Sequence, residues 1–73
     1  MATPAPGDLA DLLRSLTAQY AAANQGSAEH PLGRATVGTI QEMIPKTPPA
    51  VLQGYAIRFE DGTTFLVNVH RMP

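Results

Sequence analysis

The chain has 73 residues, of which 44% are hydrophobic and 15% are charged, and its formal net charge is −1. This length allows one modest domain, and the apolar content excludes a charged, unfolded tail. No apolar run approaches the ~18 residues that cross a membrane. The absence of cysteine excludes disulfides, thiolate metal sites and a thiol nucleophile. The near-neutral charge argues against strong electrostatic binding of nucleic acid.

The N-terminus begins with a short segment rich in proline and alanine. We predict that residues 1–7 form a flexible lead and that residues 8–73 form a single α+β domain. The lead has no basic segment and no long apolar segment, so it does not read as a secretory signal. Together with the missing cysteine, this predicts a cytoplasmic location.

An amphipathic helix is the first predicted element. Apolar residues recur at helical spacing after Asp8 and define one face: Leu9, Leu12, Leu13, Leu16, Tyr20 and Ala23. Asp8 is the expected N-cap, and residues 24–26 supply a stop signal. We therefore predict a helix over 8–24, followed by a loop over 25–34.

The segment 35–44 can be interpreted in two ways. Its threonine, valine and isoleucine content favours a strand, whereas Thr39 and Glu42 have the spacing of a helical capping box. We favour the strand because the segment is short and the chain beyond it is clearly β. The apolar alternation changes parity after Val37, which predicts a bulge at Gly38.

The C-terminal third predicts a hairpin of strands 54–59 and 63–70, preceded by a stiff proline connector over 45–49. A three-residue loop, 60–62, places every odd-numbered apolar side chain on one face, whereas a two-residue loop divides them between faces. The expected cross-strand pairs are Phe59 with Thr63, Ile57 with Phe65, and Tyr55 with Val67. Gly62 then takes the left-handed position of the turn.

The predicted fold class is α+β, with one N-terminal amphipathic helix packed on a three-stranded antiparallel sheet in the order α-β-β-β. The even-numbered face of the hairpin is expected to be wet, with Leu66 and Ala56 forming a small apolar spot. The predicted core combines the helix stripe with the odd-numbered sheet face: Leu9, Leu12, Leu13, Leu16, Tyr20, Val37, Ile40, Tyr55, Ile57, Phe59, Phe65, Val67 and Val69.

No catalytic or metal-binding pattern is present in the sequence. His30 and His70 lie 40 residues apart without the spacing of metal ligands. There is no nucleophile elbow and no phosphate-binding glycine motif. We therefore expect no enzyme activity, no cofactor and no small-molecule substrate. A small enzyme would need a pocket that holds one of the histidines beside a carboxylate.

The last strand favours a role in protein interaction. Residues 63–69 have high β propensity and carry no charge, so an edge strand here needs cover. We expect a non-catalytic interaction module, adaptor or assembly subunit that binds a second copy, as a homodimer, or a larger protein. The chain's own lead could also cover the strand, and a central position would remove the need. The expected contact residues are Arg58, Thr64, Leu66, Asn68 and His70.

A second hypothesis is a weak binder of nucleic acid or of an anionic ligand. Its basic residues would be Arg34, Lys46, Arg58, His70 and Arg71. Readers of single-stranded nucleic acid interleave aromatic and basic side chains on an exposed face, and the predicted wet face lacks that interleaving. Interaction with protein is therefore the favoured function.

Overall fold

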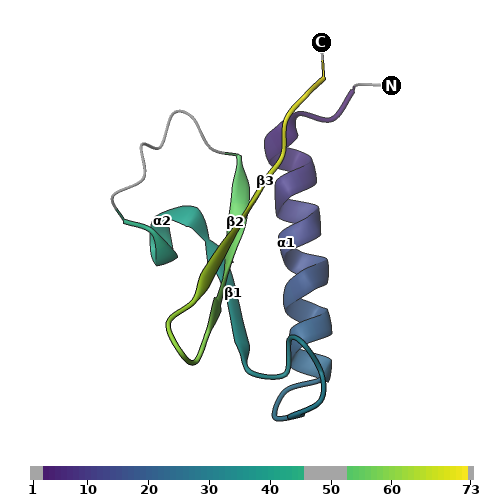
Figure 1. Cartoon of the computed structure of the whole chain (residues 1–73). Coiled ribbons are helices and arrows are strands. Elements are labelled where there is room, and N and C mark those ends of the chain that lie inside the picture. Colours follow the sequence, from purple (N-terminus) through teal and green to yellow (C-terminus); the bar gives the residue numbers. More distant parts are fainter. Residues whose placement is uncertain (1–2, 46–52, 73) are drawn as a thin grey trace.

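The computed structural model describes residues 3–45 and 53–72 (Figure 1). Its elements in chain order are α1 (Pro6–Ala23), β1 (Ala35–Thr39), α2 (Ile40–Met43), β2 (Gly54–Phe59) and β3 (Thr64–Asn68). The strands form one antiparallel sheet in the order β1-β2-β3, which leaves β3 at an edge. This arrangement confirms the predicted α+β class. Beyond Pro45, the expected proline connector lies outside the described residues.

Helix α1 begins two residues earlier than the sequence predicts, and its N-cap is Ala5 rather than Asp8. Pro6 occupies the first turn, where its fixed φ suits a helix and its missing N–H costs no hydrogen bond. Asp8 lies in that turn and accepts a hydrogen bond from the backbone N–H of Ala5 at 2.9 Å. Asp8 therefore belongs to the first turn of α1 rather than to the N-cap position, and its negative charge lies at the positive end of the helix dipole. No helix within the described residues is long and apolar enough to cross a membrane.

The segment 35–44, for which the sequence allowed either a strand or a helix, contains both: strand β1 is followed directly by the short helix α2. The hydroxyl of Thr39 accepts from the backbone N–H of Glu42 at 3.3 Å, and the Glu42 carboxylate accepts from the N–H of Thr39 at 3.1 Å. The predicted bulge is wrong, because β1 pairs with β2 without interruption and Gly38 lies opposite Ala56. The apolar parity changes because Ile40 leaves the strand and starts α2.

The hairpin has the predicted three-residue register. The observed pairs include Tyr55 with Val67 and Ile57 with Phe65. The N–H of Phe59 donates to the carbonyl of Thr63 at 2.8 Å. Gly62 has a φ of 92°, a conformation that glycine adopts at little cost. Burial of one sheet face selects this register, since a slip of one residue would move every apolar side chain to the other face.

The two helices lie on opposite faces of the sheet (Figure 1). On the odd-numbered face, the hydroxyl of Tyr55 is 3.1 Å from that of Thr17 in α1. On the other face, α2 lies so close that a Cβ at Gly38 would be 2.9 Å from the Met43 side chain. Ala56 on this second face is fully buried. The expected apolar spot of Leu66 and Ala56 is therefore wrong, because α2 takes Ala56 out of solvent and leaves Leu66 alone.

The prediction of the core is confirmed at Ile40 and Tyr55 but is wrong for the helix stripe and Phe65. Its buried apolar side chains, among the described residues, are Ala10, Ala21, Ala35, Ile40, Tyr55 and Ala56. Helix α1 contacts β1 and β2 through small side chains, which allow the helix to come close to the sheet. The apolar stripe predicted to fill the core lies on another side of α1, exposed together with Phe65. Spacing identifies the side chains that share a helix face, but it does not identify what that face contacts.

Candidate functional site

The most unusual feature of the molecule is an exposed row of large apolar side chains on α1. We call it the leucine stripe: Leu9, Leu12, Leu13, Leu16 and Tyr20. The exposed fractions of its members range from 40% for Leu13 to 57% for Tyr20. Such side chains on a helix normally face a core. Here the alanine side of α1 already packs on the sheet, and within the part of the chain that the structure describes the stripe is covered only in part, by contacts such as Leu9 with Val69 and Tyr20 with His30.

The stripe lies on the side of α1 that is nearer to β3. Leu9 lines a small apolar pocket together with Val69, which follows β3. On the opposite flank, Ala18 and Ala22 line a pocket with Val37 of β1. Figure 1 agrees, since the segment after β3 runs beside the first turns of α1. The stripe therefore lies on the flank of α1 that faces the β3 edge of the sheet.

A further exposed apolar side chain, Phe65, lies on the sheet face that α1 packs against. It belongs to β3 and shares the odd-numbered face with Ile57, its cross-strand partner. Its ring packs edge-on against Phe59 at a centroid distance of 5.8 Å, yet 56% of the residue is exposed. The leucine stripe and Phe65 together are called the apolar surface below.

The apolar surface is large for a chain of this size. Six large side chains with about half of each exposed amount to roughly 600 Å². That equals the upper end of the largest patch on a typical monomer, and such patches mark sites of association. Sequence reasoning missed this site because it assigned all six side chains to the core. The signal that could have found it is the alanine-rich second side of the same helix.

The residues expected to contact a partner lie mainly on the other face of the hairpin, and several are engaged within the chain. Arg58 donates from Nε to the hydroxyl of Thr64 at 3.4 Å and also donates to the carbonyl of Met43. The Asn68 side chain accepts from the N–H of Gln53 at 3.2 Å. The two others, Leu66 and His70, are exposed. The structure thus places the set on one face of the hairpin, apart from His70, which follows β3, and brings Arg58 into contact with Thr64.

The basic residues of the second hypothesis are not gathered into one patch by the described part of the chain. Arg34 pairs with Glu60 at 3.2 Å between exposed side chains, and Arg58 is held against the end of α2. His70 and Arg71 follow β3 and line the small pocket beside the first turns of α1. Lys46 lies outside the described residues. No observation favours anion binding over interaction with protein.

The two histidines lie in different surroundings. His30 accepts a hydrogen bond at Nδ1 from the N–H of Leu32 at 3.0 Å, and its ring lies 4.8 Å from that of Tyr20. Neither histidine bonds to a carboxylate within the described ranges. No cluster of three metal-ligating side chains occurs there either.

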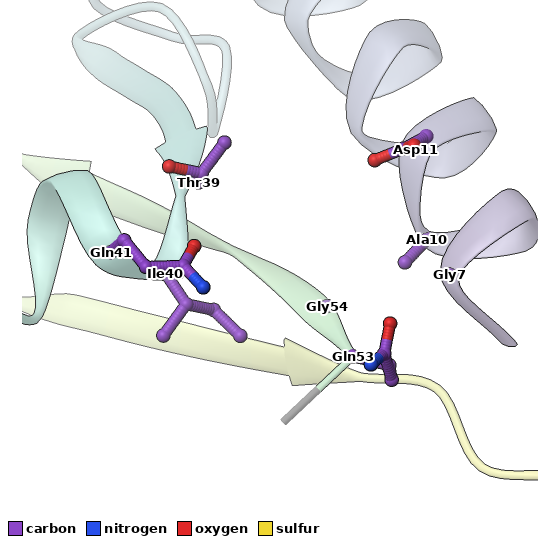
Figure 2. Close-up of a pocket in the computed structure, with 8 residues that line it drawn as sticks. All are labelled: Gly7, Ala10, Asp11, Thr39, Ile40, Gln41, Gln53 and Gly54. Atoms are coloured by element: carbon purple, nitrogen blue, oxygen red, sulfur yellow. The ribbon is translucent and has the colours of Figure 1, made fainter. Parts of the chain in front are cut away.

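A polar pocket lies between the start of α1 and the end of β1 (Figure 2). Its volume is about 200 Å³, below the ~300 Å³ at which ligand pockets begin. The charged residue in its lining is Asp11, which no histidine or basic side chain of the lining accompanies. The pocket therefore lacks the paired groups that acid–base or nucleophilic chemistry needs.

The chain was also compared with known proteins. No protein-family model, no curated protein and no solved structure matches it. The apolar surface and the edge strand β3 are therefore the two features of the molecule that bear on its function.

Proposed function

We propose that the chain is a non-catalytic protein–protein interaction module that binds another polypeptide through its apolar surface. The observation that supports this most is the exposure of the leucine stripe beside Phe65. Complete burial of a large apolar side chain is worth about 1.5–3 kcal/mol, so each of these half-exposed side chains forgoes roughly half of that free energy. A partner that covers the apolar surface recovers much of that free energy.

The edge of β3 offers a second contact for the same kind of partner. An unpaired edge presents N–H and C=O groups to which another strand can add. The contact set predicted from sequence, which includes Arg58, Leu66 and His70, belongs to this second route. The two routes use different faces of one strand and can therefore be separated by mutation.

Two neighbouring residues of β3 provide the test. Phe65 lies in the apolar surface, whereas Leu66 lies on the opposite face and is 43% exposed. Wild type, Phe65→Ser and Leu66→Ser would each be used as bait in the native cell extract, with the captured proteins quantified by mass spectrometry. The affinity for each captured protein would then be measured with purified material.

We expect Phe65→Ser to weaken binding at least tenfold, the effect of losing a central apolar contact, and Leu66→Ser to leave binding unchanged. The reverse pattern would assign binding to the edge and its even-numbered face. Equal binding by all three baits would contradict the apolar surface as the binding site and would also exclude a side-chain contribution from Leu66.

A further inference from the structure

We infer that the partner is a second copy of this chain, and that α1 of each copy covers β3 of the other. The inference rests on the proposed function and names its partner. It follows from two features of one molecule that complement each other, a strand face that is only partly covered and a helix face with half-exposed leucines.

The sheet has room for a second helix over β3. A helix is 10–12 Å across and strands lie about 4.8 Å apart, so one helix covers about two strands. Helix α1 lies mainly on β1 and β2, which leaves the odd-numbered face of β3 only partly covered, with Val67 half-buried and Phe65 exposed. A second helix at the usual 8–10 Å from α1 would lie over β3 and against the leucine stripe.

Helix α1 has the composition of a helix that lies between two layers. Its alanine side, with Ala10 and Ala21 buried, packs on its own sheet. Its leucine stripe lies on another side, so two separate sides of the helix present apolar side chains, while the third side carries Asp8 and Asp11. In a two-fold dimer the same stripe would contact both the neighbouring α1 and β3 of the second copy, so one self-complementary surface serves both chains.

The area of the apolar surface and the small size of the buried core both agree with a dimer. The roughly 600 Å² of the apolar surface, with its rim, approaches the ~800 Å² that each partner buries in a standard interface. The core of one copy is poor by contrast, since four of the buried apolar residues among those described are alanines. A domain of this size is marginally stable alone, because it buries a smaller share of its surface than a larger domain does. Association would supply the missing burial.

Edge-to-edge pairing of two β3 strands fits the apolar surface less well. It would leave the two α1 helices roughly 19 Å apart, four strand spacings, about twice the distance of packed helices. A lipid surface also fits less well, because membrane-surface helices are rich in basic residues. Helix α1 carries one basic residue, Arg14, against Asp8 and Asp11.

The mass of the full chain in solution is the first test. Sedimentation equilibrium from about 1 to 100 μM should give twice the 7.7 kDa of one chain, and the unfolding midpoint should rise with concentration because folding and association are linked. Leu16→Gln and Phe65→Ser should raise the dimer dissociation constant at least tenfold, whereas Leu66→Ser should leave it unchanged. A folded 7.7 kDa particle at 100 μM would overturn the inference.

Crosslinking tests the geometry even if those variants fold poorly. The chain has no cysteine, so single cysteines can be placed without side reactions. Leu16→Cys and Phe65→Cys chains with tags of different size would be mixed, refolded together and treated with a short bismaleimide. A mixed crosslink is expected for this pair, whereas Leu16→Cys with Leu66→Cys should give little product. A dimer that shows the opposite preference contradicts the arrangement.

The failure of this inference differs from the failure of the proposed function. A monomer that still captures a different protein through Phe65 would retain the proposed function and overturn the second copy. A monomer that floats with vesicles of anionic phospholipid, and loses that property in Phe65→Ser, would overturn both by assigning the surface to lipid. A monomer that binds nothing through Phe65 would also overturn both.

Discussion

The hydroxyl of Tyr55 joins the core to α1. Tyr55 is 6% exposed, and its hydroxyl lies 3.1 Å from that of Thr17, so each group satisfies the other where water has little access. Tyr55→Phe would keep the ring and leave the Thr17 hydroxyl without this partner. We expect a loss of about 1 kcal/mol in the free energy of unfolding, the usual net worth of such a bond.

Chemical denaturation of the variant and the wild type would measure this loss. Tyr20→Phe is the matched control, because the Tyr20 side chain is exposed and keeps its ring in the substitution. An equal effect of the two substitutions would mean that the Thr17–Tyr55 contact does not stabilise the fold.

Asp61 in the hairpin turn makes stability depend on pH. The backbone N–H of Thr63 donates to its carboxylate at 2.9 Å, and this bond, followed by the Thr63 hydroxyl, lowers the pKa of Asp61 below its ordinary value. A carboxyl whose pKa is lower in the folded state stabilises the fold above the unfolded-state pKa. That stabilisation is lost as the pH falls from about 4 through the folded-state pKa.

Asp61→Asn should therefore flatten the acid limb of the stability profile, measured by urea unfolding at several pH values between 6 and 2. Thr63→Ala is the control, since it removes the hydroxyl but keeps the backbone N–H that contributes most, and it should retain most of the acid limb. An unchanged profile in Asp61→Asn would show that the turn does not contribute to it.

The short helix α2 depends on its capping box. Thr39→Ala would remove the hydroxyl that accepts from the N–H of Glu42 at 3.3 Å, at a cost of about 1 kcal/mol. Because α2 lies over the face that contains Ala56, loss of the cap should also expose that strand position. Thr39→Ser keeps the hydroxyl and should remain close to wild type. Identical urea midpoints for Thr39→Ala and the wild type would rule out a stabilising cap.

At the scale of helices and strands, the sequence predicts the pairing of strands better than it predicts what a helix face contacts. The hairpin register could be predicted because side chains alternate with a period of two, so one arrangement of odd-numbered residues buries them together. The capping box of Thr39 and Glu42 is likewise a local pattern. The helix start was missed by two residues because Pro6 and Asp8 are both suited to a first turn, in different roles.

The contacts of α1 could not be predicted in the same way. The leucine stripe has the stronger apolar spacing, so pattern alone assigns it to the core. Alanines such as Ala10 and Ala21 contribute little to that pattern, yet they allow a close approach to the sheet. The candidate site was missed for this reason, since its six side chains were the ones that the pattern placed inside.

The whole molecule offers one measurement that separates the two ways of covering β3. In an antiparallel pair, alternate residues direct their N–H groups towards the neighbouring strand. The bond from Val69 to Gln53 and the bond from Phe59 to Thr63 fix that alternation. The N–H groups of Thr64, Leu66 and Asn68 therefore point away from β2, towards the free edge.

Hydrogen exchange reports on this edge directly. If α1 of a second copy lies over the face of β3, the edge stays open, and these three amides should exchange at least a hundredfold faster than those of the central strand β2 at every protein concentration. If two copies join edge to edge, the same three amides become hydrogen-bonded, and their exchange slows as the concentration rises. Amide-resolved exchange by NMR at two concentrations therefore distinguishes face docking from strand addition without any substitution.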